Sequence, residues 1–284
     1  GGADEGEGSL GPARIYSSSS FYFVMIRLPV QYWRFLIRSF LDEGADRVFY
    51  DQGRLQSLSV DRVSLIRASI HDHDCGRMEL DLDKLNELLK KARVKRGYMT
   101  VRRIGEGKEE EEVEVRITGD QCLTTTFKYK REVGSSFNPD VTRLNFTDGF
   151  RIGAEALART CEGLKDCDIM FLYVGSKLFV GGRLFESQLR FTTIPTVAGN
   201  GSFSAFEPSR LCRFLRRISE FSSVLTVRLK TDGPIYIHAP TPYFDVEFMQ
   251  APRAVSSEDV KLLKEVLIQE GEAQAIATLE QLMT

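Results

Sequence analysis

The sequence predicts an α+β fold of two similar domains, each with antiparallel strands and two helices. Segments with alternating apolar residues, rich in β-branched and aromatic side chains, are joined by short turns, which favours hairpins over parallel units. Four other segments have apolar residues at helical spacing. The second pair of these segments repeats the first at a nearly constant offset, which indicates a duplicated unit.

Changes in composition along the chain predict the domain boundaries. Residues 1–20 are rich in glycine, serine and glutamate and are expected to form a disordered tail. The N-terminal domain is expected over residues 21–130 and the C-terminal domain over residues 142–253. Residues 131–141 contain Gly, Ser, Asn and Pro with little periodicity, so they are interpreted as a connector. Residues 254–284 then form an extension.

The four predicted helices each have one apolar stripe. They are expected at residues 29–44, 81–93, 153–165 and 208–221. In the fourth, Leu211, Phe214, Leu215 and Ile218 form the stripe, and Pro208 suits the first turn. Each stripe predicts a helix with one face packed on a sheet.

The predicted strands lie between the helices. They are expected at residues 62–70, 97–104, 111–118 and 122–130, and then at 168–175, 177–184, 188–194, 223–230, 234–239 and 243–249. In the extension, Val260, Leu263 and Leu267 recur at helical spacing after capping residues, and a second helical piece is expected beyond Gly271.

The bulk composition indicates a globular, intracellular protein. The formal net charge is −2, and 42% of the residues are hydrophobic. No apolar segment is long enough for a membrane helix, and no secretion signal is recognised. Five separated cysteines are expected to be reduced thiols. No metal-ligand spacing or catalytic signature is found, so neither a metal, a cofactor nor an enzymatic activity is expected.

Basic side chains are concentrated on the predicted helices. The candidate residues are Arg34, Arg38, Lys84, Lys90, Lys91, Arg159, Arg210, Arg213, Arg216 and Arg217. On the fourth helix, Arg210, Arg213 and Arg217 are spaced to share the face opposite the apolar stripe, with Arg216 on its flank. One such face alone is often only a solvated surface. Several of them on one side of a sheet would suit phosphates, without reading base sequence.

Five segments resemble, in order, those of the sliding clamp family, proliferating cell nuclear antigen (PCNA). They are GRLQSLSVDRVSLIRASI (53–70), LDKLNELLKKAR (82–93), ALARTCEGL (156–164), DGPIYIHA (232–239) and FMQAPR (248–253). The resemblance extends from about residue 21 to residue 253. It implies the DNA clamp fold in a subunit of a three-membered ring, of archaeal origin.

The resemblance also implies a function without chemistry of its own. The ring would encircle duplex DNA, with the basic helices lining its channel. It would tether DNA polymerase, flap endonuclease and DNA ligase, after a clamp loader has placed it on DNA. The other subunits could be copies of this chain or different clamp chains. No cofactor is implied.

Partner binding in the family uses an apolar pocket beside the connector and the last strand. The matching residues here are Leu65, Val133, Phe137, Pro234, Met249, Ala251 and Pro252. Three features depart from the family pattern. The connector is shorter and less acidic, the third helix has few basic residues, and the extension continues past the usual end.

Two other functions are compatible with the same sequence. One is a checkpoint-type clamp subunit that recruits signalling or repair factors. The other is an interaction scaffold whose clamp-like domains do not encircle DNA. Loading on nicked circular DNA would separate the scaffold from a working clamp, and polymerase stimulation would separate the checkpoint type.

Overall fold

The two halves of the chain contain the same elements in the same order. The computed structural model describes residues 24–106, 110–130, 140–185 and 188–282. The predicted tail and nearly all of the predicted connector lie outside these residues. The first half comprises β1 (Val24–Pro29), α1 (Val30–Asp42), β2 (Arg47–Asp51), β3 (Arg54–Leu58), β4 (Ser64–Ile70), β5 (Arg77–Asp81), α2 (Leu82–Ala92), β6 (Tyr98–Glu106), β7 (Glu110–Thr118) and β8 (Cys122–Lys130).

The second half repeats this order after a short 3₁₀ helix, Val141–Leu144. It comprises β9 (Asp148–Gly153), α3 (Ala154–Glu162), β10 (Ile169–Val174), β11 (Leu178–Phe185), β12 (Gln188–Ile194), β13 (Ser202–Phe206), α4 (Pro208–Ile218), β14 (Val224–Leu229), β15 (Ile235–Pro240) and β16 (Phe244–Gln250). The duplication predicted from helix spacing is therefore present element by element. The strands β1, β2, β3, β5, β9 and β13 were not predicted.

The strands form three antiparallel sheets. Two four-stranded sheets have the orders β1-β6-β7-β8 and β12-β11-β10-β13. The third has eight strands in the order β5-β2-β3-β4-β16-β15-β14-β9. This long sheet joins the two halves, because β4 pairs with β16 from Ser64–Gln250 to Ile70–Phe244.

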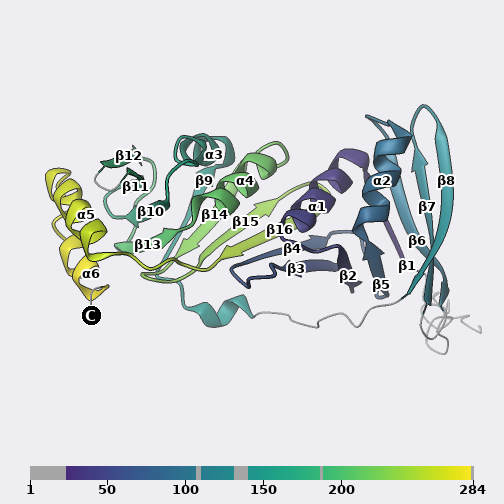
Figure 1. Ribbon diagram of the computed structural model, residues 1–284, viewed down its shortest axis with the longest axis horizontal. Coiled ribbons are helices and arrows are strands. Elements are labelled where there is room, and N and C mark those ends of the chain that lie inside the picture. Colours follow the sequence, from purple (N-terminus) through teal and green to yellow (C-terminus); the bar gives the residue numbers. More distant parts are fainter. Residues whose placement is uncertain (1–23, 107–109, 131–139, 186–187, 283–284) are drawn as a thin grey trace, which may run out of the picture.

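Helices α1 to α4 lie side by side along one side of the molecule and cover one face of the long sheet (Figure 1). We call this face the helix face and the opposite one the outer face. The apolar stripe of α1 is buried, with Trp33, Leu36 and Phe40 each 1% exposed. The indole nitrogen of Trp33 donates a hydrogen bond to the Met99 carbonyl at 2.8 Å, which satisfies the one polar atom of that ring.

Local sequence explains where the inner helices begin. The Asp81 carboxylate accepts a hydrogen bond from the Lys84 amide at 3.1 Å at the start of α2. At the start of α4, Pro208 occupies the first turn and the Glu207 carboxylate accepts from the Ser209 amide at 2.9 Å. These caps place the basic residues that follow at defined positions along the helices.

Aromatic packing also joins the halves. The rings of Phe214 in α4 and Phe248 in β16 stack at 4.5 Å between centroids. Tyr32 in α1 packs against Phe221, just after α4, and against Phe244 in β16. The first half therefore contributes side chains to the core of the second, and both halves share one apolar cluster.

The expectation that all five cysteines are reduced thiols is wrong for two of them. Cys161 of α3 and Cys212 of α4 form a disulfide, with Cα atoms 5.3 Å apart. Their sequence separation of 51 residues gives no local signature, and only the packing of α3 on α4 brings them together. Cys75, Cys122 and Cys167 are free thiols, of which Cys167 is buried.

The extension forms α5 (Ser257–Gln269) and α6 (Ala275–Gln281), which confirms its predicted helical character. The Ser256 hydroxyl caps α5 by accepting from the Asp259 amide at 3.1 Å. Both helices pack on the outer face of the β12-β11-β10-β13 sheet (Figure 1). The cluster they bury comprises Ile169, Phe171, Tyr173, Phe179, Phe203, Ala205, Val260, Leu263, Leu267, Ala275 and Leu279. The extension thus covers an apolar sheet face of its own chain.

Candidate nucleic-acid interface

All ten predicted DNA-contacting residues lie on α1, α2, α3 and α4, on the helix side of the molecule (Figure 1). The structure separates them into a group paired with acidic residues of the other half, an exposed group and a partly engaged group. This division depends on which acidic residues approach each helix. Spacing within a helix does not reveal it.

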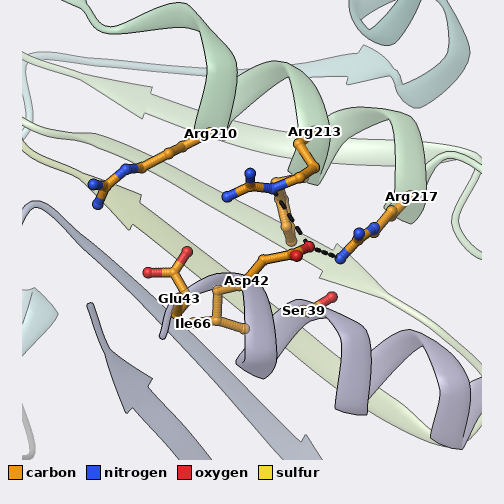
Figure 2. A pocket seen from close by; sticks show the side chains of 8 residues that line it. Ser39, Asp42, Glu43, Ile66, Arg210, Arg213 and Arg217 are labelled. Carbon is orange, nitrogen blue, oxygen red and sulfur yellow. Dashed lines mark ion pairs between the residues drawn. The ribbon is translucent and has the colours of Figure 1, made fainter. Parts of the chain in front are cut away.

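Three arginines of α4 share one face, as their spacing predicts, but that face meets α1 of the first half (Figure 2). It also meets Asp61, which lies between β3 and β4. Arg210 Nη1 lies 2.8 Å from Asp61 Oδ1. Arg213 Nε lies 3.4 Å from Asp42 Oδ2, and Arg217 pairs with the same carboxylate. The three side chains are 25%, 33% and 24% exposed. They cross-link the halves and are only partly open to solvent.

The surroundings of these pairs are tightly packed and polar. The Glu43 carboxylate is buried and accepts a hydrogen bond from the Ser64 hydroxyl. Burial raises the pKa of Glu43, and the Ser64 hydrogen bond and nearby arginines oppose this rise. The hydrogen bonds from Arg210 and from the Ser59 hydroxyl lower the pKa of Asp61. The cavity between these residues, of ≈ 10 Å³, has room for about one water molecule, so it is not a ligand pocket.

Besides Arg159, four of the predicted cations are exposed: Arg38, Lys90, Lys91 and Arg216. Among the ion pairs between described residues, none involves any of these four. They come from α1, α2 and α4 and form what we call the open cation set. An unpaired surface cation keeps its full charge for an external anion, so this set is best placed to meet phosphate groups.

The remaining three cations are partly engaged within the protein. Arg34 donates from Nη2 to the Val94 carbonyl at 2.8 Å. The Lys84 ammonium lies 5.1 Å from the centre of the Phe127 ring. Arg159 is exposed and pairs with Glu155 one turn earlier in α3. Surface pairs of this kind contribute little to stability, so Arg159 remains able to exchange its partner.

The described residues among the predicted partner-binding set gather at one end of the β15–β16–β4 junction. Leu65 and Met249 face each other across β4 and β16. The Ala251 amide donates to the Val63 carbonyl at 2.8 Å, next to that pair. Pro234 immediately precedes β15, whose Ile235 pairs with Gln250, and Pro252 follows Ala251. Val133 and Phe137 lie outside the described residues.

Alternation along the strands places the Leu65 and Met249 side chains on the outer face. In β4 and β16, Ile66, Ala68, Val246 and Phe248 belong to the core on the helix face. Leu65 and Met249 therefore point the other way. The structure thus places Leu65 and Met249 on the face of the long sheet opposite to the helices with the predicted DNA-binding residues.

Two of the edge strands in the described part of the chain, β8 and β12, were not singled out by the sequence. β8 ends one four-stranded sheet and β12 ends the other. They lie towards opposite ends of the molecule (Figure 1). Most residues of both strands are exposed or half-buried, including Leu123 and Phe191, which are each 39% exposed. An open edge presents free backbone hydrogen-bonding groups to another chain.

Two kinds of feature are absent from the described residues. No three His, Cys, Asp or Glu side chains in this part of the chain are grouped so that they could hold a metal ion. None of the described helices is long and apolar enough to cross a membrane.

No protein-family model matches the chain, and no curated protein sequence matches it significantly. Solved structures do match this chain. A PCNA2–PCNA3 complex from Sulfolobus tokodaii matches with a TM-score of 0.68 and 15% identity, covering 82% of this chain and 100% of that one. PCNA from Thermococcus kodakaraensis matches with a TM-score of 0.66 and 20% identity, covering 81% and 99%.

A third match has a bound partner. In the structure of the C-terminal region of FEN-1 bound to A. fulgidus PCNA, the matched chain gives a TM-score of 0.63 and 13% identity, covering 82% of this chain and 100% of that one. The known clamp chains are covered almost completely, whereas part of this chain has no counterpart in them. The protein has the fold of the PCNA sliding clamps.

Proposed function

We propose that this chain is a subunit of a DNA sliding clamp, a ring that encircles duplex DNA and tethers replication and repair enzymes. The observation that carries the proposal is the relation between the paired and unpaired strands. In the duplicated order, β12 corresponds to β4 and β8 corresponds to β16. β4 and β16 pair with each other within the chain, whereas β12 and β8 do not pair with each other.

Pairing β8 of one chain with β12 of the next would repeat the β4–β16 junction between chains. Such a head-to-tail contact uses two different surfaces, so it continues from chain to chain until the rotation closes a ring. The resemblance to the PCNA family implies three subunits in that ring, and the matched PCNA2–PCNA3 complex supports contacts between clamp chains. Either copies of this chain or different clamp chains could fill the other two positions.

The helix face would then line the channel. The open cation set, with Arg159 and the partly paired arginines of α4, would contact the DNA backbone. Phosphate contacts of this type are independent of sequence. A formal net charge of −2 is compatible with this, because acidic residues elsewhere balance the helices. Loose contacts suit a ring that must slide.

The outer face would bind client enzymes through Leu65, Pro234, Met249, Ala251 and Pro252. We propose DNA polymerase, flap endonuclease and DNA ligase as clients, and a clamp loader to place the ring on DNA. The A. fulgidus PCNA structure with a bound FEN-1 segment supports the flap endonuclease among these clients. Tethering would make each client's rebinding to the template intramolecular, which raises its effective concentration without any reaction on the clamp.

Topology provides the decisive test. The chain is assembled with its ring partners, loaded on nicked circular DNA by a clamp loader, and its retention is followed at increasing salt. We expect retention on circles and release when a restriction enzyme linearises the DNA, because a ring can slide off an end. Protein that stays bound equally to linear DNA would contradict encirclement and would favour an ordinary surface binder.

The same assay tests the open cation set. Replacing Arg38, Lys90, Lys91 and Arg216 together by alanine should reduce retention uniformly across sequences. The slope of log K against log salt should fall by up to about 0.9 for each phosphate that the variant no longer neutralises. The matched control replaces four exposed cations elsewhere, Arg54, Arg151, Arg228 and Lys261. Equal reductions in the two variants would refute the channel assignment.

A single substitution tests the client surface. Met249 is half-buried on the outer face, so Met249→Asp places a charge where an apolar partner is expected. We expect affinity for a client peptide with a glutamine and paired aromatic residues to fall by about tenfold or more. Fluorescence anisotropy measures this. Thr226→Asp, also half-buried but on β14, should bind the peptide normally; a wild-type result for Met249→Asp would move the client site elsewhere.

A further inference from the structure

The C-terminal extension covers the sheet that ends in β12, which is an edge strand among the described residues. We propose that α5 and the outer face of β12 together form a docking surface for strand β8 of a second copy of this chain. The inference rests on the ring proposed above and assigns the extension a place in the contact between subunits.

Ion pairs fix the orientation of α5. Its two ends are attached beside β11, because Asp259 pairs with Arg183 at 2.9 Å and Glu270 with Lys177 at 3.6 Å. On another side, Lys264 Nζ lies 3.4 Å from Glu280 of α6. Since α6 contacts β13 and the strand order is β12-β11-β10-β13, α5 is the helix nearer to β12.

An apolar surface follows from this orientation. Leu262 and Val266 share a helix stripe with Asp259 and Glu270, because these residues are spaced three or four apart. Both are half-buried and lie on the side of α5 turned away from α6.

β12 continues this surface. Leu189 packs against the cluster beneath α5 and α6, so Phe191, two residues later, lies on the same face. We call Leu189, Phe191, Leu262 and Val266 the apolar shelf. Opposite Phe191 in β11 is Gly181, which has no side chain to cover the ring.

The duplication identifies what the shelf would meet. β4 and β12 each have seven residues, so their alignment places Phe191 at the position of Arg67. Within the chain, Arg67 crosses the junction and pairs with Glu247 of β16 at 2.8 Å. The outward residue at this position therefore contacts the adjoining strand. For Phe191, the adjoining strand in the ring is β8 of the next copy.

The outer face of β8 has suitable chemistry for that contact. Thr124, Thr126 and Lys128 point outwards, because they alternate with Phe127 and Tyr129, which pack inwards. They offer two methyl groups and a lysine stem to the shelf. The exposed Glu258 and Glu265 flank Leu262 on α5, so a carboxylate lies near the position where the Lys128 ammonium would arrive.

The test measures self-association of the full chain by sedimentation velocity over a range of concentrations. Leu262→Glu combined with Val266→Glu puts charge on the shelf, and we expect the dissociation constant to rise by about tenfold or more. Phe191→Ser should act in the same direction. The control is Ile268→Glu, on the same helix at a residue 51% exposed, which should associate as wild type. Thermal unfolding confirms that each variant is folded.

A fourth variant separates this inference from the proposed ring. Leu123→Asp changes β8 on its inward face, away from the shelf. If Leu123→Asp dissociates the copies while the shelf variants do not, the edges pair without help from α5, so the inference is overturned and the ring stands. If none of these variants dissociates the assembly, both fail. A wild-type chain that remains monomeric at every concentration also overturns the inference, and the DNA linearisation assay then decides the proposed function with other ring subunits.

Discussion

Replacing Arg67 by alanine is expected to destabilise the protein by about 3–5 kcal/mol, because it leaves a buried carboxylate without its cation. Arg67 and Glu247 form a two-contact pair, Nε–Oε1 at 3.0 Å and Nη2–Oε2 at 2.8 Å. Their side chains are only 8% and 18% exposed. The Tyr236 hydroxyl donates to the same carboxylate at 2.8 Å. Urea unfolding of wild type and variant measures the change.

Two further variants make this prediction specific. Arg77→Ala removes an exposed pair with Asp51, whose side chains are 66% and 40% exposed, and should cost less than about 1 kcal/mol. Arg67→Met combined with Glu247→Leu removes both buried charges and should recover much of the stability. If Arg67→Ala costs no more than Arg77→Ala, the pair does not stabilise the junction between the halves.

The same pair makes stability depend on pH. Burial raises the pKa of Glu247, but the hydrogen bonds from Arg67 and Tyr236 outweigh it, so the net pKa is lowered. A carboxyl with a lowered folded-state pKa stabilises the protein above the ordinary glutamate pKa of about 4.3. That contribution disappears as the pH falls through the folded-state value. In Arg67→Ala the decline should begin at higher pH.

Removing the Cys161–Cys212 disulfide is also expected to lower the free energy of unfolding strongly. The bond closes a loop across 51 residues, and loop-closure entropy for that length corresponds to about 4 kcal/mol. We expect Cys212→Ser to lower the free energy of unfolding by an amount of this order, and a reductant to do the same to wild type. Cys122→Ser removes an exposed free thiol and should unfold as wild type. A reductant effect that persists in Cys212→Ser would point to another cause.

Helix positions could be predicted because each inner helix has a continuous apolar stripe. Leu211, Phe214, Leu215 and Ile218 predicted α4, and all four are buried. Some strands gave no such signal. β13, Ser202–Phe206, is buried at all five positions although it contains two serines, so its short sequence does not read as a buried apolar run. The fold class can thus be predicted from local periodicity, whereas short strands that are fully buried cannot.

The candidate site shows the same limit. Spacing placed Arg210, Arg213 and Arg217 on one face, but the carboxylates they contact are more than a hundred residues away in the sequence, at Asp61 and Asp42. Local sequence does not encode such a contact. Arg216 differs from them only in angle around the helix, and this angle leaves it in solvent. The open cation set could therefore be separated from the paired arginines only by the structure.

The helices of the extension could be predicted from the sequence, but the surface on which they pack could not. Val260, Leu263 and Leu267 predicted a buried helix face. What they pack on, Phe171, Tyr173 and Phe203, sits in strands that already have a core on their other side. Such strands are apolar on both faces, a signal that could have indicated a second covering layer.

This arrangement has a consequence for synthesis. The ribosome completes β10 to β13 before it makes α5 and α6, so a growing chain exposes a patch containing Phe171, Tyr173, Phe179 and Phe203. Uncovered aromatic surface of this kind promotes aggregation during folding. A premature stop codon between β16 and α5 would therefore yield a polypeptide that has all its clamp strands but an exposed apolar surface at one end. Such a polypeptide would be a substrate for chaperones and proteases.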